Sequence, residues 1–119
     1  MIYLDACATA PLRPGVLQRM IEIQDRAWAN PSSLHGLGLQ AAEALERARS
    51  QIADRLSAEH RDVVFTSGAT ESVHLALQGL AATRSPGRVV ISAVEHPAVF
   101  GAARLLAKHG WDVAEWPVD

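Results

Sequence analysis

Apolar residues recur at helical spacing in two segments of the amino-terminal half. The first helix is predicted from Pro14 to about Trp28, with an apolar stripe at Val16, Leu17, Met20, Ile23 and Ala27. The second is predicted from about Gly36 to Leu56, with a stripe at Ala41, Ala42, Leu45, Ala48, Ile52 and Leu56. Residues 1–12 are expected to form an extended arm, and the NPSS segment at 30–33 to form a loop. The stripe of the second helix is expected to be buried.

Short apolar runs then alternate with helical segments. Strands are predicted at 62–65, 88–91 and 111–116, with helices at 70–83 and 97–109. Gly110 is typical of a helix end. Strands joined by helical crossovers favour a parallel sheet and an α/β fold. The chain is therefore divided into an arm with two helices at 1–60 and a βαβαβ segment at 61–119.

Polar residues follow the first predicted strand, at positions 66–71 (TSGATE). Ligands of open α/β sheets bind beyond the carboxyl ends of the strands. Amides and hydroxyls at a helix start suit a phosphate group. Simple capping of the helix by Ser67 or Thr70, with Glu71 in the first turn, explains the same pattern. Both explanations stay open at this point.

His96 follows the second predicted strand and precedes Pro97. A histidine there suits stacking on an aromatic cofactor or proton transfer, and equally suits a capping role at the surface. The same alternatives apply to His35. His60 and His109 are expected in solvated positions and His74 on a helix. No spacing typical of metal-ligating histidines occurs, so no metal site is expected.

Composition narrows the function classes further. The net charge of -2, without a basic cluster, argues against nucleic-acid binding. Cys7 is the single cysteine, so no internal disulfide forms, and it is expected to be a small buried residue. Lys108 is the single lysine and is expected to close a helix. No membrane span or secretory signal is recognised, so a cytoplasmic location is expected.

Four segments carry a family resemblance: residues 3–11 (YLDACATAP), 30–38 (NPSSLHGLG), 65–72 (FTSGATES) and 95–99 (EHPAV). In this order they resemble motifs of the cysteine desulfurases, pyridoxal-phosphate enzymes of the class V aminotransferase group. The resemblance implies a fold-type I transferase-like α/β fold. It also implies that the chain is the amino-terminal portion of the large domain, with a short parallel sheet and flanking helices.

The resemblance implies specific roles as well. The amide of Ala69 and the amide and hydroxyl of Thr70 would bind the phosphate of pyridoxal 5′-phosphate. His96 would stack on its pyridine ring. The implied parent enzyme converts L-cysteine to L-alanine and passes sulfur through an enzyme persulfide to iron–sulfur or thio-modification pathways. A homodimer and a sulfur-acceptor or scaffold protein are the implied partners.

The chain departs from the family pattern at Ala6, Ala10 and His74. The family's Ser-x-His-Lys segment, its aspartate for the pyridine nitrogen and its mobile-loop cysteine do not occur in these 119 residues. No catalytic residue is therefore assigned, and the chain alone is expected to be inactive. The alternatives are a selenocysteine lyase or another class V aminotransferase, a non-catalytic module that binds a phosphate compound or a partner subunit, and a structural fragment without a ligand.

Overall fold

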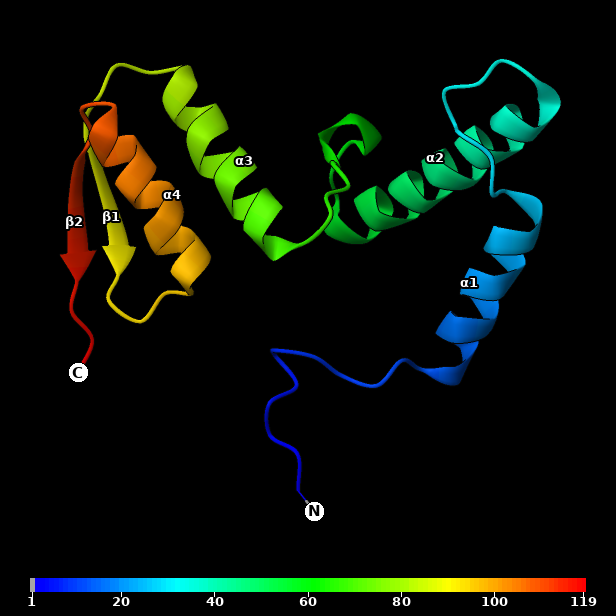
Figure 1. The fold of residues 1–119 in the computed structure, drawn as a ribbon, viewed down its shortest axis with the longest axis horizontal. Helices are drawn as coiled ribbons and strands as arrows, with labels where there is room; N and C mark the ends of the chain where they lie inside the picture. Colours follow the sequence, from blue (N-terminus) through cyan, green and yellow to red (C-terminus); the bar gives the residue numbers. More distant parts are fainter. Residues whose placement is uncertain (1) are drawn as a thin grey trace. The chain divides into compact units, whose positions relative to one another are not determined.

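The computed structural model describes residues 2–119, and Figure 1 shows the chain as a ribbon. It divides into two compact units, Met1–Val64 and Phe65–Asp119, which are described one at a time. The first unit contains α1 (Pro14–Arg26), α2 (Gly36–Leu56) and the short 3-10 helix η1 (His60–Asp62). The second contains α3 (Ala69–Ala82), β1 (Arg88–Ser92), α4 (Pro97–Lys108) and β2 (Asp112–Trp116). All four predicted helices are confirmed, and their ends differ from the prediction by two residues at most.

The helices of the first unit bury few side chains. No residue of α1 is buried, and α2 buries only Gly38, Ala41 and Ala53. Leu56, at the end of the predicted stripe, is 69% exposed. The prediction that the stripe of the second helix is buried is therefore wrong for most of its positions. In the described chain only α1 and η1 pack on α2. Much of the apolar surface of α1 and α2 is therefore left uncovered.

A tight turn leads into α2. The Ser33 amide donates to the Asn30 carbonyl (3.0 Å), and the Asn30 side-chain oxygen accepts from the Ser32 amide (2.9 Å). Gly38, in the first turn of α2, lies directly against this turn. A Cβ on Gly38 would stand 2.2 Å from the Ser33 carbonyl oxygen, far inside van der Waals contact. This close approach of two backbone segments requires glycine.

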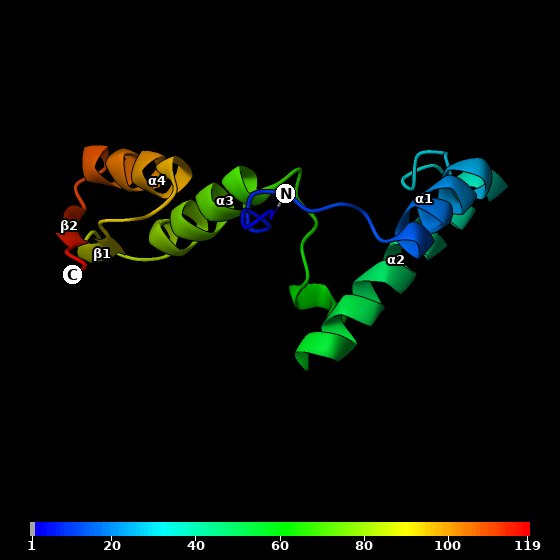
Figure 2. The same cartoon turned by 90° about the horizontal axis from the view of Figure 1, so that it is seen from below.

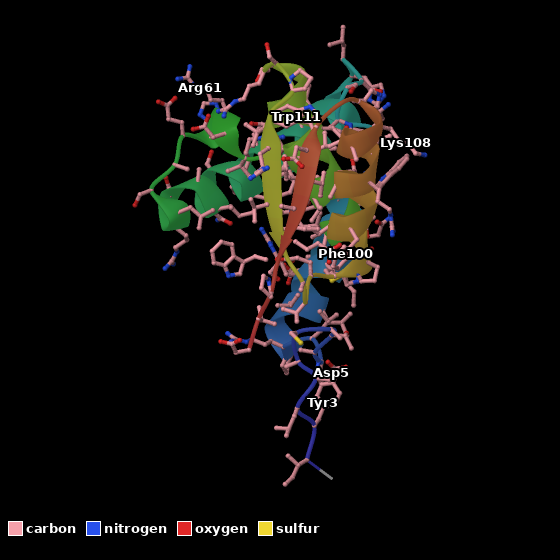
Figure 3. The ribbon with its side chains drawn as sticks, turned by 90° about the vertical axis from the view of Figure 1, so that its left-hand side faces the viewer. Tyr3, Asp5, Arg61, Phe100, Lys108 and Trp111 are labelled. Carbon is pink, nitrogen blue, oxygen red and sulfur yellow. The ribbon has the colours of Figure 1, made fainter. Side chains whose placement is uncertain are left out.

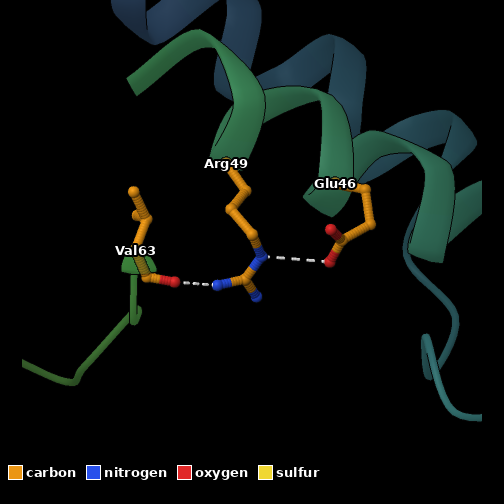
Figure 4. A network of polar contacts seen from close by, with 3 residues as sticks. All are labelled: Glu46, Arg49 and Val63. Carbon is orange, nitrogen blue, oxygen red and sulfur yellow. Dashed lines mark hydrogen bonds and ion pairs between the residues drawn. The ribbon is translucent and has the colours of Figure 1, made fainter. Parts of the chain in front are cut away.

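Arg49 ties the end of the first unit to α2 (Figure 4). Its Nε donates to Glu46 Oε1 (3.1 Å), and its Nη1 donates to the backbone carbonyl of Val63. Residues 62–65, predicted as a strand, are not one: η1 ends at Asp62, and Val63 is extended but pairs with no strand in the described chain. The predicted βαβαβ segment is thus observed as helix α3 followed by β1, α4 and β2.

The second unit is built on a parallel pair of strands. The register runs from Arg88 opposite Asp112 to Ser92 opposite Trp116. Helix α4 connects the strands and packs on both, while α3 packs on α4. Figure 3 shows β1 and β2 side by side with α4 next to them. The buried apolar residues of this unit are Ile91, Ala102, Ala103 and Leu106.

Gly110 ends α4 as predicted, with a φ of +87. Its amide donates to the Ala107 carbonyl (3.1 Å), and the Trp111 amide donates to the Leu106 carbonyl (3.2 Å). This pair of bonds satisfies the last carbonyls of the helix and turns the chain into β2. Within residues 2–119, no helix has both the length and the apolar content needed to cross a membrane.

Replacing Gly38 by alanine should destabilise the first unit. The new methyl group would collide with the Ser33 backbone, and overpacking of this kind costs about 1–3 kcal/mol. The free energy of unfolding, measured in denaturant by circular dichroism, tests this. Gly36→Ala is the matched control, since a Cβ there meets nothing within 4 Å, and it should be neutral or stabilising. Equal unfolding midpoints for the two variants would contradict the required close approach.

Candidate functional site

The starts of α3 and α4 lie at the end of the second unit where β1 and β2 finish. The two helices run side by side in the same direction, as Figures 1 and 2 show. Ala69 and Thr70 are the first two residues of α3, and His96 is the N-cap of α4. All three side chains are exposed. The structure therefore places the three predicted site residues at one edge of the unit, on two neighbouring helix starts.

The start of α3 has no side-chain cap. Its N-cap is Gly68, and the first helical hydrogen bond runs from the Ser72 amide to the Gly68 carbonyl (3.1 Å). The amides of Ala69, Thr70 and Glu71 precede that bond and find no acceptor in the described part of the chain. The alternative in which Ser67 or Thr70 is the N-cap is therefore not the one observed. The outcome is an exposed helix start with free donors, which is the arrangement that binds anions.

Glu71 bonds to the residue that precedes the N-cap. Its Oε2 accepts from the Ser67 amide (2.7 Å) and from the Ser67 hydroxyl (2.6 Å). The bond from the Ser67 hydroxyl, with the bond from the Ser67 amide second, lowers the pKa of Glu71 below its ordinary value. Thr66 Oγ1 and Ser72 Oγ form a second pair, 2.7 Å apart. Neither pair is predicted from the sequence, although Glu71 in the first turn is a visible signal of capping.

His96 caps α4 with its ring. Nδ1 accepts from the Ala98 amide (3.1 Å), so the neutral ring carries its proton on Nε2. The capping alternative is therefore observed, and stacking on a cofactor remains a prediction. His35 starts α2 in the same way, with Nδ1 accepting from the Gly38 amide (3.3 Å).

His74 joins α3 to α4. It is half-buried, and a Cβ on Gly101 would lie 3.7 Å from its Nε2, so the ring packs on the bare backbone of α4. One turn further along α3, the Gln78 side chain donates to the Ala102 carbonyl (3.2 Å). At this position the departure from the family pattern makes a contact between two helices.

Cys7 is exposed, so its predicted burial is wrong. Its Sγ lies 3.7 Å from Asp5 Oδ1. The Tyr3 hydroxyl lies 2.9 Å from the carbonyl oxygens of both Asp5 and Thr9, and this pins the arm into a short turn. The arm lacks a packed neighbour in the described chain that would cover the thiol.

The first unit carries a groove of ≈ 800 Å³ along α1 and α2. Apolar residues such as Ile23, Ala41 and Ala44 line it together with three arginines. It contains none of the three predicted cofactor-binding residues. Among residues 2–119, no group of three histidine, cysteine or acidic side chains is arranged to hold a metal ion.

A sequence model of the family described as "Aminotransferase class-V" matches residues 2–119. The chain is 48% identical over 105 residues to a cysteine desulfurase of Frankia sp., covering 87% of this chain and 25% of that protein. It is 43% identical over 117 residues to the cysteine desulfurase IscS of Shewanella denitrificans, covering 94% of this chain and 29% of that protein.

The chain is also similar to parts of solved structures. A NifS-like protein superposes with a TM-score of 0.84 at 34% identity, covering 94% of this chain and 31% of that one. A structure named "SspA in complex with cysteine" superposes with a TM-score of 0.84 at 38% identity, covering 95% and 33%. The chain spans about a quarter to a third of the length of these relatives.

The hydrogen bonds from Ser67 favour the ionised carboxylate of Glu71, and this gives a test by pH. The stabilisation is present above the ordinary value of 4.5 and is lost as the pH falls through the lowered pKa of the folded chain. In a titration of the side-chain carboxyl by carbon NMR, Ser67→Ala should raise the pKa of Glu71 part of the way back. Ser72→Ala, which removes a nearby hydroxyl with no bond to Glu71, should leave it unchanged. Identical titration curves for wild type and Ser67→Ala would contradict the assignment.

Proposed function

Because the chain belongs to the class-V aminotransferase family, we propose that it supplies the phosphate-binding part of a cysteine desulfurase that uses pyridoxal 5′-phosphate. Family membership confirms the resemblance drawn from the four motifs, and the solved relatives confirm the α/β fold. In the proposed reaction, L-cysteine loses its sulfur to an enzyme thiol. L-alanine and a persulfide are formed, so atoms and electrons balance without an external oxidant.

The uncapped start of α3 is the observation that carries the proposal. The Ala69 and Thr70 amides and the Thr70 hydroxyl are exposed on one helix turn, and a phosphate dianion needs several such donors. The positive end of the helix dipole adds to this attraction. The residues present therefore fit the phosphate group. When bound, pyridoxal phosphate supplies an electron-accepting ring for cleavage at the substrate carbon.

His96 is proposed to lie against the pyridine ring. Its cap bond to the Ala98 amide fixes the ring, and an aromatic face held in this way loses little freedom on stacking. Nε2, which takes no part in the cap bond, is free to donate its proton toward the substrate. Thr70 lies at the start of α3 and His96 at the start of the neighbouring helix α4. These two helix starts lie at the same edge of the unit, which supports this role.

Lys108 does not suit cofactor attachment. It ends α4, twelve residues beyond His96, which is about 18 Å along a helix. Figure 3 shows Lys108 at the same end of the unit as Trp111, with Phe100 toward the other end of α4. Because Lys108 is the single lysine of the sequence, these residues offer no covalent anchor at the proposed site.

Cysteine as the substrate is supported by the names of the relatives and by the solved relative in complex with cysteine. A homodimer and a sulfur-acceptor or scaffold protein complete the proposal. Support for a partner surface comes from exposed apolar side chains on one helix, α1: Val16, Leu17, Met20 and Ile21. Uncovered side chains of this kind are typical of surfaces that pack against protein.

Variants of His96 separate its capping role from its proposed contact with the cofactor. Asparagine is a good N-cap, so His96→Asn should keep the free energy of unfolding, whereas His96→Ala should lose about 1 kcal/mol. Both should weaken binding of pyridoxal phosphate several-fold, because both remove the ring. Quenching of tryptophan fluorescence measures the binding. If His96→Asn binds pyridoxal phosphate with the affinity of the wild type, His96 is not part of the site. If the wild type shows no saturable binding, the cofactor proposal for this chain is refuted.

The 119-residue chain should release no sulfide from L-cysteine above the rate of free pyridoxal phosphate. The reason is chemical: the proposed site has no lysine, and the exposed Cys7 lies in the amino-terminal arm, outside the unit that holds α3 and α4. Sulfide is measured colorimetrically with the chain and the cofactor mixed, against the cofactor alone. Turnover above that background would contradict the expectation.

A further inference from the structure

We infer that Glu71 is a positioning residue that keeps the start of α3 open for the cofactor phosphate. This inference rests on the proposed function. It concerns how the chain prepares the amides of Ala69 and Thr70 before any ligand arrives, and it assigns a task to a carboxylate that would otherwise only repel an anion.

The position of the carboxylate is unusual for a glutamate in the third helical position. In a capping box, that side chain bonds to the amide of the N-cap residue, and the hydroxyl of the N-cap residue covers an amide of the first turn. Here Glu71 bonds one residue earlier, to the amide and hydroxyl of Ser67. The amides from Gly68 to Glu71 are left without an acceptor in the described chain. The carboxylate thus restrains the entry to the helix without covering its donors.

Gly68 contributes by having no side chain. Its φ of 162 is extended backbone, which any residue adopts, and a Cβ there meets nothing within 4 Å. Neither conformation nor crowding within the chain requires glycine. A serine or asparagine would fit, but its side-chain oxygen would accept from the amides of the first turn. Glycine at the N-cap leaves those amides to a ligand.

A second pair holds the other side of the turn. Thr66 Oγ1 and Ser72 Oγ are 2.7 Å apart, and each lies 3.3 Å from the Gly68 carbonyl oxygen. Because each hydroxyl donates one hydrogen bond, one of the two donates to the other hydroxyl and the second donates to the Gly68 carbonyl, while Glu71 accepts from Ser67. The Glu71–Ser67 bonds and the Thr66–Ser72 pair both cross this turn. Together they fix the direction of the amides between them, which lowers the entropy cost of binding an anion.

The charge of Glu71 makes the role testable. A carboxylate this near an anion site repels phosphate, so a purely electrostatic effect predicts tighter binding whenever the charge is removed. A positioning effect predicts tighter or equal binding only when an acceptor for the Ser67 amide remains. Glu71→Gln keeps an acceptor oxygen and removes the charge, whereas Glu71→Ala removes both.

The experiment follows the amide NMR signals of Ala69 and Thr70 during titration with inorganic phosphate. We expect Glu71→Ala to weaken binding about tenfold, the loss typical of a charge-assisted hydrogen bond, and Glu71→Gln to bind at least as tightly as the wild type. Glu43→Ala and Glu43→Gln are matched controls, because they remove an exposed carboxylate from α2. They should leave the phosphate affinity unchanged.

The outcomes separate the inference from the function it rests on. If the wild type gives no phosphate-dependent shifts at these two amides, the proposed cofactor site is refuted. If the wild type binds and Glu71→Ala binds equally or more tightly, the site stands and Glu71 is merely a repelling charge. Equal weakening by both Glu71 variants would also overturn the positioning role, since the neutral acceptor would have failed to rescue it.

Discussion

Parallel pairing of β1 with β2 is the constraint from which the candidate site follows. Parallel neighbours cannot be joined by a tight turn, so the chain returns through α4, which runs back along the sheet. The start of α4 therefore lies where β1 ends. Because α3 packs on α4 and runs in the same direction, its own start reaches the same edge (Figure 1). Free helix amides and the carboxyl ends of strands meet there as a consequence of topology.

The ends of the helices could be predicted because their causes are local. Pro14 and Pro97 begin helices and Gly110 ends one, each through its own backbone geometry. The strand predicted at 62–65 failed for the opposite reason. A strand exists only with a partner, and the Val63 carbonyl is bonded to the Arg49 side chain instead. Burial depends equally on distant segments, so the exposure of Cys7 could not be read from its neighbours in sequence.

In the candidate site, too, features with local causes could be predicted and features that depend on the path of the chain could not. The three site residues came from the family resemblance, and their positions at helix starts agree with the local sequence signals. The capping pattern did not follow from the sequence, because Ser67, Gly68 and Thr70 are all acceptable N-caps that differ by about 1 kcal/mol or less. Which one is used depends on the path of the chain into α3. The bond from Ser67 to Glu71 required coordinates to be seen.

The three helix starts next to site motifs make an internal comparison. In α2 and α4 an imidazole satisfies an amide of the first turn, whereas in α3 no side chain does so. Glycine in place of serine at an N-cap lowers stability by only a few tenths of a kcal/mol, so an open start is energetically minor in the absence of a ligand. Departures from a local rule at small cost are expected where a chain binds something. The fold alone does not select a reaction; the proposal of a phosphate-bearing aromatic cofactor rests on the family, on the open start of α3 and on His96 at the start of the neighbouring helix.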